Sequence, residues 1–214
     1  ALMRDPKLAA AIMRAVKSAV GVPVTLKMRL GWDNASLNAA EFGRIAEDAG
    51  LSMLAVHGRT RCQMYTGEAD WHKIAAVVDA VSIPVIANGD IRCADTAVQA
   101  MAASGSAGVM VGRGAQGRPW LLAQIGDVLA GRKMRAAPSI RARHELMRAH
   151  LDDMITYYGS AAMRLARKHI SWYAYGLSGA AELRDIANNT TDPETVFAAV
   201  DKFFQQLYGE AQAA

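Results

Sequence analysis

Cysteine is scarce in this sequence, and long apolar runs are missing from it. The 214 residues include two cysteines, Cys62 and Cys93, whose spacing fits neither a disulfide framework nor a metal site. No apolar run reaches the ~20 residues that a membrane-spanning helix needs, and the first residues lack the pattern of a secretory signal. We therefore expect a protein of the reducing cytoplasm that binds neither a metal ion nor a membrane.

The composition of a disordered chain is also missing. Hydrophobic residues make up 52% of the sequence and charged residues 21%, which is typical of a soluble globular protein. The length permits one or two domains with a sizeable core. The formal net charge of +4 permits an anionic partner without establishing one.

A strand–helix unit occurs four times between residues 22 and 131. Each strand is short, apolar and rich in β-branched residues, and this alternation indicates a parallel sheet covered by helices. Three of the four helices are expected to end at glycines, namely Gly50, Gly105 and Gly131, and Pro119 is expected early in the last helix. The predicted strands are 22–29, 54–59, 84–90 and 108–114, and the predicted helices are 37–49, 71–81, 93–104 and 118–131.

Polar residues stand at the carboxyl end of every predicted strand. The sequence has Lys27 and Arg29, then His57 with Arg59, then Asn88 with Asp90, and last Arg113. This distribution is typical of a (β/α)8 barrel, whose chemistry lies at that end of the strands. An open doubly wound sheet, the alternative, would gather polar groups at one switch point, often after a glycine-rich fingerprint. The sequence favours the C-terminal half of a TIM barrel over residues 1–136.

Half a barrel leaves two sheet edges open, so it is not stable by itself. The sequence starts inside a helix-like segment rather than before a strand. We therefore expect four further βα units upstream of this sequence. An obligate dimer of half barrels is the alternative.

Residues 137–214 contain no strand candidate and predict a small all-α domain. Its expected helices are 140–159, 161–177, 180–189 and 193–212, the last with Asp192 as N-cap and Pro193 at the first helical position. In the second of these, Arg164, Arg167 and Lys168 share one face near His169, and Trp172, Tyr173 and Tyr175 follow. Basic and aromatic side chains in this pattern bind RNA, although a solvated face with core aromatics gives the same pattern.

The last two predicted strands end in the elements of an anion site. Gly112 and Gly114 allow close approach of a ligand to the backbone, and Arg113 precedes a helix N-terminus. Asn88, Gly89 and Asp90 end the strand before and supply the other half of a phosphate cradle. A tight turn beside a surface arginine is the alternative reading.

Lys27, His57 and Asn88 are expected to face one pocket at the strand ends. Together they donate hydrogen bonds of the kind that a planar heterocycle such as a flavin accepts. Lys27 and Arg29 share a face of their strand, which favours an anion or electron-rich carbonyl groups over a Schiff base. Asp90 either accepts from a sugar-like hydroxyl of the cofactor or caps the next helix.

The stretch "LAVHGRTR" (54–61) combines several of these roles. Ala55 and Val56 are predicted core residues, and Gly58 lets the chain turn out of the barrel. Arg59 and Arg61 are then expected on the rim, within reach of an RNA backbone. The two cysteines are expected to act as small hydrophobic residues, and Trp32 is expected to pack or to line a pocket.

Four segments carry a resemblance to a known family. "VPVTLKMRLGWD", "VHGRTRCQMYTGEADW", "IPVIANGDI" and "VMVGRGAQGRPWL" closely resemble the tRNA-dihydrouridine synthases, in particular the bacterial group of dihydrouridine synthase B and NifR3-like proteins. "RKHISWYAYGL" resembles a helix of that family's C-terminal domain. The resemblance runs in collinear order over nearly the whole chain.

The resemblance implies an FMN-dependent barrel and a helical tRNA-binding domain, here 1–136 and 137–214. Such enzymes reduce a uridine of the tRNA D-loop, with NADPH supplying electrons through the flavin, and the target base must leave the tRNA stack. The implied flavin-ring contacts are Lys27 and His57. Asn88, Gly89 and Asp90 would flank the ribityl–phosphate tail, Gly112 and Arg113 would hold the phosphate, and Arg29 would lie near flavin or uracil.

One departure from the family concerns the proton donor. In the family this donor is a cysteine in the N-terminal half of the barrel, and neither Cys62 nor Cys93 stands at that position. We therefore expect the 214 residues alone to bind FMN weakly and to be inactive, and the full-length protein to be a monomer. Two alternatives stay open: an FMN barrel acting on a free pyrimidine, and a non-catalytic RNA-binding or regulatory fragment.

Overall fold

The computed structural model describes the backbone of residues 2–213 and the side chains of residues 2–209. Internal contacts divide the chain into two compact units. The first contains the residues up to Gly114 together with Ile125–Lys133, and the second contains Ala115–Gln124 together with the residues from Met134 onward. This division differs from a single boundary near residue 136, because it places Ala115–Gln124 in the second unit.

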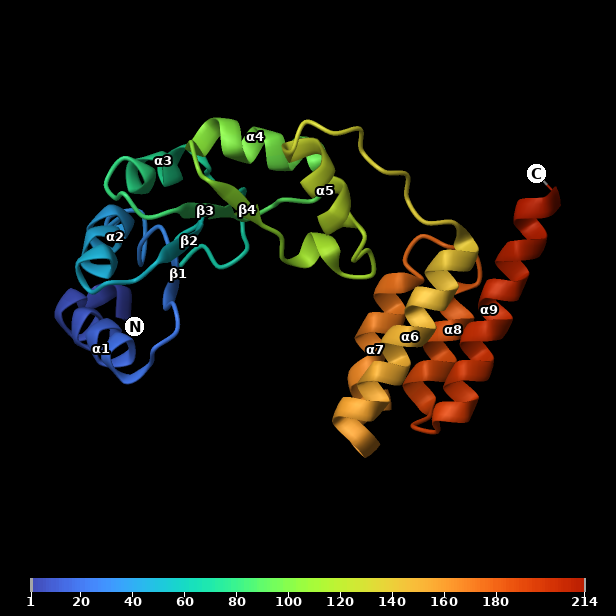
Figure 1. The fold of residues 1–214 in the computed structure, drawn as a ribbon. Helices are drawn as coiled ribbons and strands as arrows, with labels where there is room; N and C mark the ends of the chain where they lie inside the picture. Colours follow the sequence, from blue (N-terminus) through green and yellow to red (C-terminus); the bar gives the residue numbers. More distant parts are fainter. Residues whose placement is uncertain (1, 214) are drawn as a thin grey trace. The chain divides into compact units, whose positions relative to one another are not determined.

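The first unit is a mixed α/β structure built on a four-stranded parallel sheet (Figure 1). The strands β1 (Thr25–Arg29), β2 (Met53–His57), β3 (Val85–Asn88) and β4 (Gly108–Met110) lie in that order. The helices α2 (Ala39–Asp48), α3 (His72–Val78) and α4 (Ala94–Ser104) connect them along one side of the sheet. A 3-10 turn (Leu2–Arg4) and α1 (Pro6–Ala19) precede β1, and α5 (Leu121–Leu129) follows β4. This arrangement confirms the predicted parallel sheet with helical connections.

Strand β2 lies at the centre of the core. Leu54 and Val56 are completely buried, and Ala55 is nearly so. Helices α2 and α3 add further buried apolar side chains to the core of this unit, among them Phe42, Ile74 and Val77. The apolar run of β2 therefore reflects burial on both faces, as expected for a strand inside a parallel sheet.

The register of the sheet sets one row of residues across the strand ends. Arg29 pairs with His57, His57 pairs with Asn88, and Asn88 pairs with Met110. Lys27 lies two residues further back, level with Ala55. His57 is thus level with Arg29 rather than with Lys27, and the long side chain of the lysine covers the difference.

Several predicted boundaries are wrong by a few residues. The first strand begins at Thr25, and the fourth ends at Met110 instead of 114. Helix α5 begins at Leu121, so Pro119 lies in the turn before it rather than inside it. Two successive turns precede α5, closed by hydrogen bonds from the Arg118 amide to the Ala115 carbonyl oxygen and from the Leu121 amide to the Arg118 carbonyl oxygen. Gly105 ends α4 with a left-handed φ of 66°, as predicted.

The second unit contains four helices with a common apolar core: α6 (Ile140–Tyr158), α7 (Ala162–Tyr173), α8 (Ala180–Asn189) and α9 (Pro193–Ala213). The Asp192 carboxylate accepts a hydrogen bond from the Thr195 amide, which confirms its capping role ahead of Pro193. Helix α7 ends four residues earlier than predicted, because the chain turns through left-handed conformations at Gly176 and Gly179. No helix among the described residues is both long and apolar enough to span a bilayer.

A close backbone approach makes Gly117 a sensitive position. Gly117 and Gly131 both have a φ of 68°. A Cβ at Gly117 would lie 2.3 Å from the Trp172 carbonyl oxygen, whereas a Cβ at Gly131 would meet no heavy atom within 4 Å beyond its chain neighbours. Gly131→Ala should therefore cost about 1 kcal/mol of backbone strain, and Gly117→Ala about 3 kcal/mol or more because the backbone must also move. Thermal unfolding followed by circular dichroism checks the difference. Equal losses in the two variants would contradict it.

Candidate functional site

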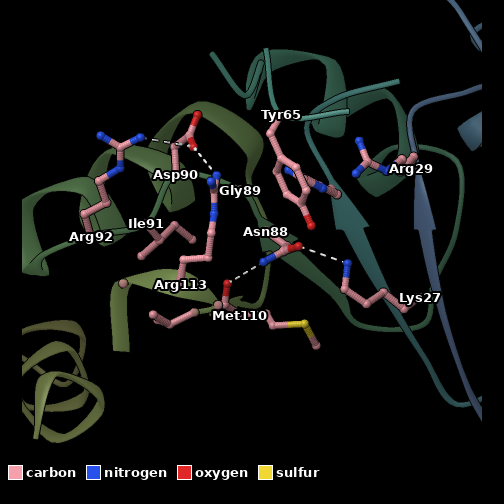
Figure 2. A pocket seen from close by; sticks show the side chains of 14 residues that line it. Lys27, Arg29, Tyr65, Asn88, Gly89, Asp90, Ile91, Arg92, Met110 and Arg113 are labelled. Carbon is pink, nitrogen blue, oxygen red and sulfur yellow. Dashed lines mark hydrogen bonds and ion pairs between the residues drawn. The ribbon is translucent and has the colours of Figure 1, made fainter. Parts of the chain in front are cut away.

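A cavity of about 280 Å³ lies at the carboxyl ends of the strands, within the first unit (Figure 2). It brings together all the residues that the sequence predicts for the site. These are Lys27, Arg29, His57, Asn88, Gly89, Asp90, Gly112 and Arg113. Because parallel strands end at the same edge of a sheet, residues from four separate chain segments converge there.

Asn88 connects β1 to β4 across the floor of the cavity. Its Oδ1 accepts a hydrogen bond from Lys27 Nζ at 3.0 Å, and its Nδ2 donates to the Met110 carbonyl oxygen at 2.8 Å (Figure 2). Both contacts fix the orientation of the carboxamide. Burial, and secondarily the charge of Arg29, lower the pKa of Lys27. The ammonium group is thus held in place and is less fully hydrated than a surface lysine.

His57 is buried, with 7% of its surface exposed, and is surrounded by cations. Burial is the main cause that lowers its pKa to about 4, and the charges of Arg29, Lys27 and Arg59 act in the same direction. The imidazole is therefore neutral at pH 7. Gly89 makes its position possible, because a Cβ at Gly89 would lie 2.7 Å from His57 Cδ2 and its φ of 114° suits only glycine.

Arg59 does not lie on the rim, and that prediction is wrong. Its exposed fraction is 2%, and it forms a bidentate ion pair with Asp90 at 3.1 and 2.6 Å. Arg61 is exposed, as predicted. The position after Gly58 is buried because the following loop closes over the side chain, and the Arg59 donors bond to the carbonyl oxygens of Thr66 and Gly67.

Asp90 does not cap the next helix, so that alternative is also wrong. Cys93 is the N-cap of α4, and the Thr96 hydroxyl completes a capping box with it. The Asp90 carboxylate instead accepts from Arg59 and from the Ala69 amide at 2.9 Å. These partners lower its pKa against the opposing effect of burial. The backbone of Asp90 has a left-handed φ of 54°, which is uncommon for a residue other than glycine. Through its carboxylate, Asp90 connects the end of β3 to the loop after β2.

Tyr65 is one of several cavity residues, Arg92 among them, that the sequence analysis missed. It stands eight positions after His57, in the loop after β2, and its ring lies 4.4 Å from the Arg113 guanidinium carbon and 5.6 Å from that of Arg29 (Figure 2). The Arg29 guanidinium also donates to the carbonyl oxygens of Thr60 and Met64, both at 2.8 Å. The only sequence signal for Tyr65 is an aromatic residue in a loop that follows a strand end.

The two predicted glycines after β4 differ in their surroundings. A Cβ at Gly114 would lie 2.4 Å from the Ile91 carbonyl oxygen, so this glycine lets the loops after β3 and β4 pack together. A Cβ at Gly112 would meet no heavy atom within 4 Å beyond its own chain neighbours, and the residue lines the cavity. Neither glycine has a positive φ, and Gly114 lies in the 3-10 turn Arg113–Ala115, so the tight-turn alternative holds for Gly114. Open space beside backbone at Gly112 is the arrangement that lets a ligand approach closely.

The charge balance of the cavity favours an anion. Lys27, Arg29, Arg92 and Arg113 line it, and Asp90 is its one carboxylate. Since Asp90 pairs with the buried Arg59, its charge is already compensated. The described residues hold no group of three or more histidine, cysteine or acidic side chains suited to a metal ion.

Other predicted residues lie away from this cavity. Cys62 and Cys93 are both exposed free thiols rather than packed hydrophobic residues. Trp32 lines a separate cavity of about 490 Å³, as predicted, and its ring lies against the guanidinium groups of Arg4 at 5.1 Å and Arg61 at 6.0 Å.

The basic residues predicted in α7 divide between surface and packing. Arg164 and Lys168 are exposed, whereas Arg167 donates to the Ala187 carbonyl oxygen at 3.2 Å. Tyr173 packs against the helical core, and Tyr175 has 85% of its surface exposed.

Comparisons with known proteins identify the family of the chain. The family described as "Dihydrouridine synthase (Dus)" matches residues 1–208, and the chain belongs to this family. A probable tRNA-dihydrouridine synthase of Rhodobacter capsulatus is 50% identical over 207 residues, which cover 96% of this chain and 63% of that protein.

Two further relatives give similar values. A probable tRNA-dihydrouridine synthase of Rickettsia conorii is 47% identical over 97% of this chain and 63% of its own length. The tRNA-dihydrouridine synthase B of Xanthomonas axonopodis pv. citri is 42% identical, with the same coverage of each chain. The chain thus spans somewhat under two thirds of the length of these relatives.

The cationic surroundings of His57 lead to a prediction about its titration. Lys27→Met removes one of the charges that lower the pKa of His57, so this pKa should rise, whereas Lys73→Met, at an exposed lysine outside the cavity, should leave it unchanged. The imidazole resonances of His57, followed by NMR against pH, measure the midpoint directly. An unchanged midpoint in Lys27→Met would refute the electrostatic explanation.

The same pKa has a consequence for stability. Since the folded state lowers the pKa of His57 from 6.5 to about 4, the unfolded chain binds more protons between these values. The contribution of His57 to stability is therefore complete above pH 6.5 and decreases as the pH falls toward 4.

Proposed function

We propose that this chain provides the flavin-contacting half of the barrel and the tRNA-binding helical domain of an FMN-dependent tRNA-dihydrouridine synthase. The observation that carries the proposal is the convergence of Lys27, His57, Asn88, Gly112 and Arg113 on one cation-rich cavity. The reaction is the reduction of the carbon–carbon double bond of a uridine in the tRNA D-loop, with NADPH as the reductant. A tRNA substrate agrees with the expected cytoplasmic location.

The residues present fit FMN. Gly112 leaves open space beside the backbone, and Arg113 supplies a guanidinium group for the phosphate. Lys27 and His57 offer hydrogen bonds to the carbonyl groups and ring nitrogens of an isoalloxazine. Asn88, Gly89 and Asp90 are assigned to the ribityl–phosphate tail. Because Asp90 is paired with Arg59, its carboxylate does not oppose a phosphate with an uncompensated charge.

Bound FMN supplies the hydride for the uracil ring. The chain's own residues bind and orient the cofactor: Asn88 holds the ammonium of Lys27 in one place, and the neutral His57 offers a hydrogen bond without adding a further positive charge. Arg29 lies beside them, close to the flavin or the substrate uracil. Neither Cys62 nor Cys93 lines the cavity, and we assign the proton donor to a cysteine outside this sequence.

The open sheet supports the half-barrel part of the proposal. Among the described residues, β1 and β4 each pair with one neighbouring strand, and unpaired edges of this kind are normally covered or closed. The relatives are longer than the matched region. We assign the remaining strands of a (β/α)8 barrel to a part of the protein outside these 214 residues, and we expect the complete protein to be a monomer.

A chimera tests the function. The matched 207 residues of the Rhodobacter capsulatus relative are replaced by this chain, and the product is incubated with FMN, NADPH and tRNA that lacks dihydrouridine. We expect dihydrouridine, measured by mass spectrometry of the digested tRNA, and no turnover of free uracil. We expect the 214 residues alone to be inactive and to bind FMN weakly.

Arg113→Ala in this chimera should raise the Kd of FMN at least tenfold and leave that of riboflavin, which lacks the phosphate, nearly unchanged. Arg44→Ala, at an exposed arginine on α2 outside the cavity, is the matched control. A chimera that binds FMN but forms no dihydrouridine would contradict the proposed function. Turnover of free uracil would favour the alternative, a pyrimidine reductase.

The helical unit yields a separate prediction for tRNA binding. Arg164→Ala combined with Lys168→Ala removes two exposed cations from α7. If both contact phosphates, the slope of log K against log salt should decrease in magnitude by roughly 1.4 to 1.8, since each phosphate contact contributes about 0.7 to 0.9. Filter binding of tRNA to the chimera at several salt concentrations measures the slope. A slope equal to that of Arg44→Ala would exclude this face of α7 from the interface.

A further inference from the structure

Arg59 uses every N–H donor of its guanidinium group inside the first unit. Nε donates to the Thr66 carbonyl oxygen at 3.2 Å, and Nη2 donates to the Gly67 carbonyl oxygen and to Asp90 Oδ2, both at 2.6 Å. Nη1 contacts Asp90 Oδ1 at 3.1 Å and His57 Nε2 at 3.4 Å. A guanidinium group has five such donors and no acceptor. Each of the five is therefore assigned, and one of them points to the imidazole.

This contact restricts the protonation of His57. Since Arg59 can only donate, Nε2 of His57 must accept, and an imidazole that accepts at one nitrogen carries its proton on the other. We propose that Arg59 is a positioning residue that fixes His57 in the tautomer with its proton on Nδ1. The opposite tautomer would set two N–H donors against each other at a buried contact, where an unmet donor is costly.

Asp90 and Gly89 hold the two partners of this contact in place. The carboxylate of Asp90 binds both Nη atoms of Arg59 and also the Ala69 amide, so the guanidinium plane has one orientation. Gly89 packs closely against His57 Nε2, since a Cβ added at Gly89 would lie 3.0 Å from that nitrogen. The Gly89 carbonyl oxygen is itself fixed by the indole N–H of Trp71 at 2.9 Å. Nε2 is thus enclosed by Arg59 and Gly89.

Nδ1 of His57 is then the nitrogen available to a ligand. Nδ1 has no hydrogen bond among the described residues. It is also not a buried polar atom without a partner: in the described part of the chain, Asn38 Oδ1 is the one atom of that kind. His57 lines the cavity. The cavity wall therefore presents one fixed imidazole donor, which selects an acceptor atom in the bound ring. This selection of a ligand atom rests on the proposed flavin site, whereas the tautomer does not.

The tautomer can be read in the chain without any ligand. In uniformly 15N-labelled protein at pH 7, a long-range 1H–15N correlation spectrum distinguishes a protonated ring nitrogen from an accepting one. We expect protonated Nδ1 and accepting Nε2 for His57. Arg59→Lys keeps the positive charge but cannot supply the planar set of donors, so the spectrum should change to a mixture or to the Nε2–H form.

Arg61→Lys is the matched control, because Arg61 is exposed, stands two residues after Arg59 in the sequence and lies against Trp32 rather than His57. It should leave the His57 tautomer unchanged. Asp90→Asn provides a second test if Arg59→Lys does not fold: the guanidinium loses its ionic partner, and the preference for Nδ1–H should weaken. A wild-type spectrum with Nε2–H, or an Arg59→Lys or Asp90→Asn spectrum identical to wild type, would overturn the proposal.

Cofactor affinity separates this proposal from the proposed function. In the chimera, Arg59→Lys should raise the Kd of FMN and of riboflavin by the same factor, about tenfold, since the ring contact is lost and the phosphate contact is not. Arg61→Lys should change neither. A chimera that binds no flavin would refute the flavin site while leaving the tautomer result valid, and an Arg59→Lys chimera with unchanged flavin affinity would refute the selection by Nδ1–H.

Discussion

The ion pair between Arg59 and Asp90 is the interaction on which the rest of the site depends. Arg59 is 2% exposed, so its charge is stable only because Asp90 and two loop carbonyl oxygens surround it. Removing one partner of such a pair typically costs about 3–5 kcal/mol, since the other charge is left buried and alone. The pair joins the loop after β2 to the end of β3, and the same guanidinium contacts His57 Nε2 and the carbonyl oxygens of Thr66 and Gly67, the two residues after Tyr65.

The pair also decides the electrostatics of the cavity. Without compensation by Arg59, the carboxylate of Asp90 would stand among the groups proposed to bind a phosphate. With it, Lys27, Arg29 and Arg113 provide a positive field. His57 stays neutral because burial lowers its pKa and, secondarily, because the charges of Arg29 and Lys27 act in the same direction. The cavity therefore presents two kinds of hydrogen-bond donor. The cationic side chains can bind an anion, and the neutral imidazole of His57 can donate to an uncharged ring. This division matches a cofactor that has a phosphate at one end and a planar heterocycle at the other.

Much of the fold and of the site could be predicted from the sequence. The alternation of apolar strands and helices predicted the parallel sheet, and the polar residues and glycines at the strand ends predicted eight of the cavity residues. Both signals are local, because they depend on period and on position along a strand. Helix boundaries were less accurate: Pro119 lies in a turn and α7 ends at Tyr173, since turns and tertiary packing compete with helix propensity there.

The sequence by itself therefore determined the order of the elements, the edge of the sheet at which the chemistry gathers, and the family to which the chain belongs. Only the tertiary structure decided that Arg59 is buried rather than on the rim, that Asp90 binds it instead of capping α4, and that Tyr65 reaches the cavity. Each of these depends on a contact between segments that are distant in the chain. Local patterns do not encode such contacts, because a charged side chain in a loop reads as exposed until its partner is known.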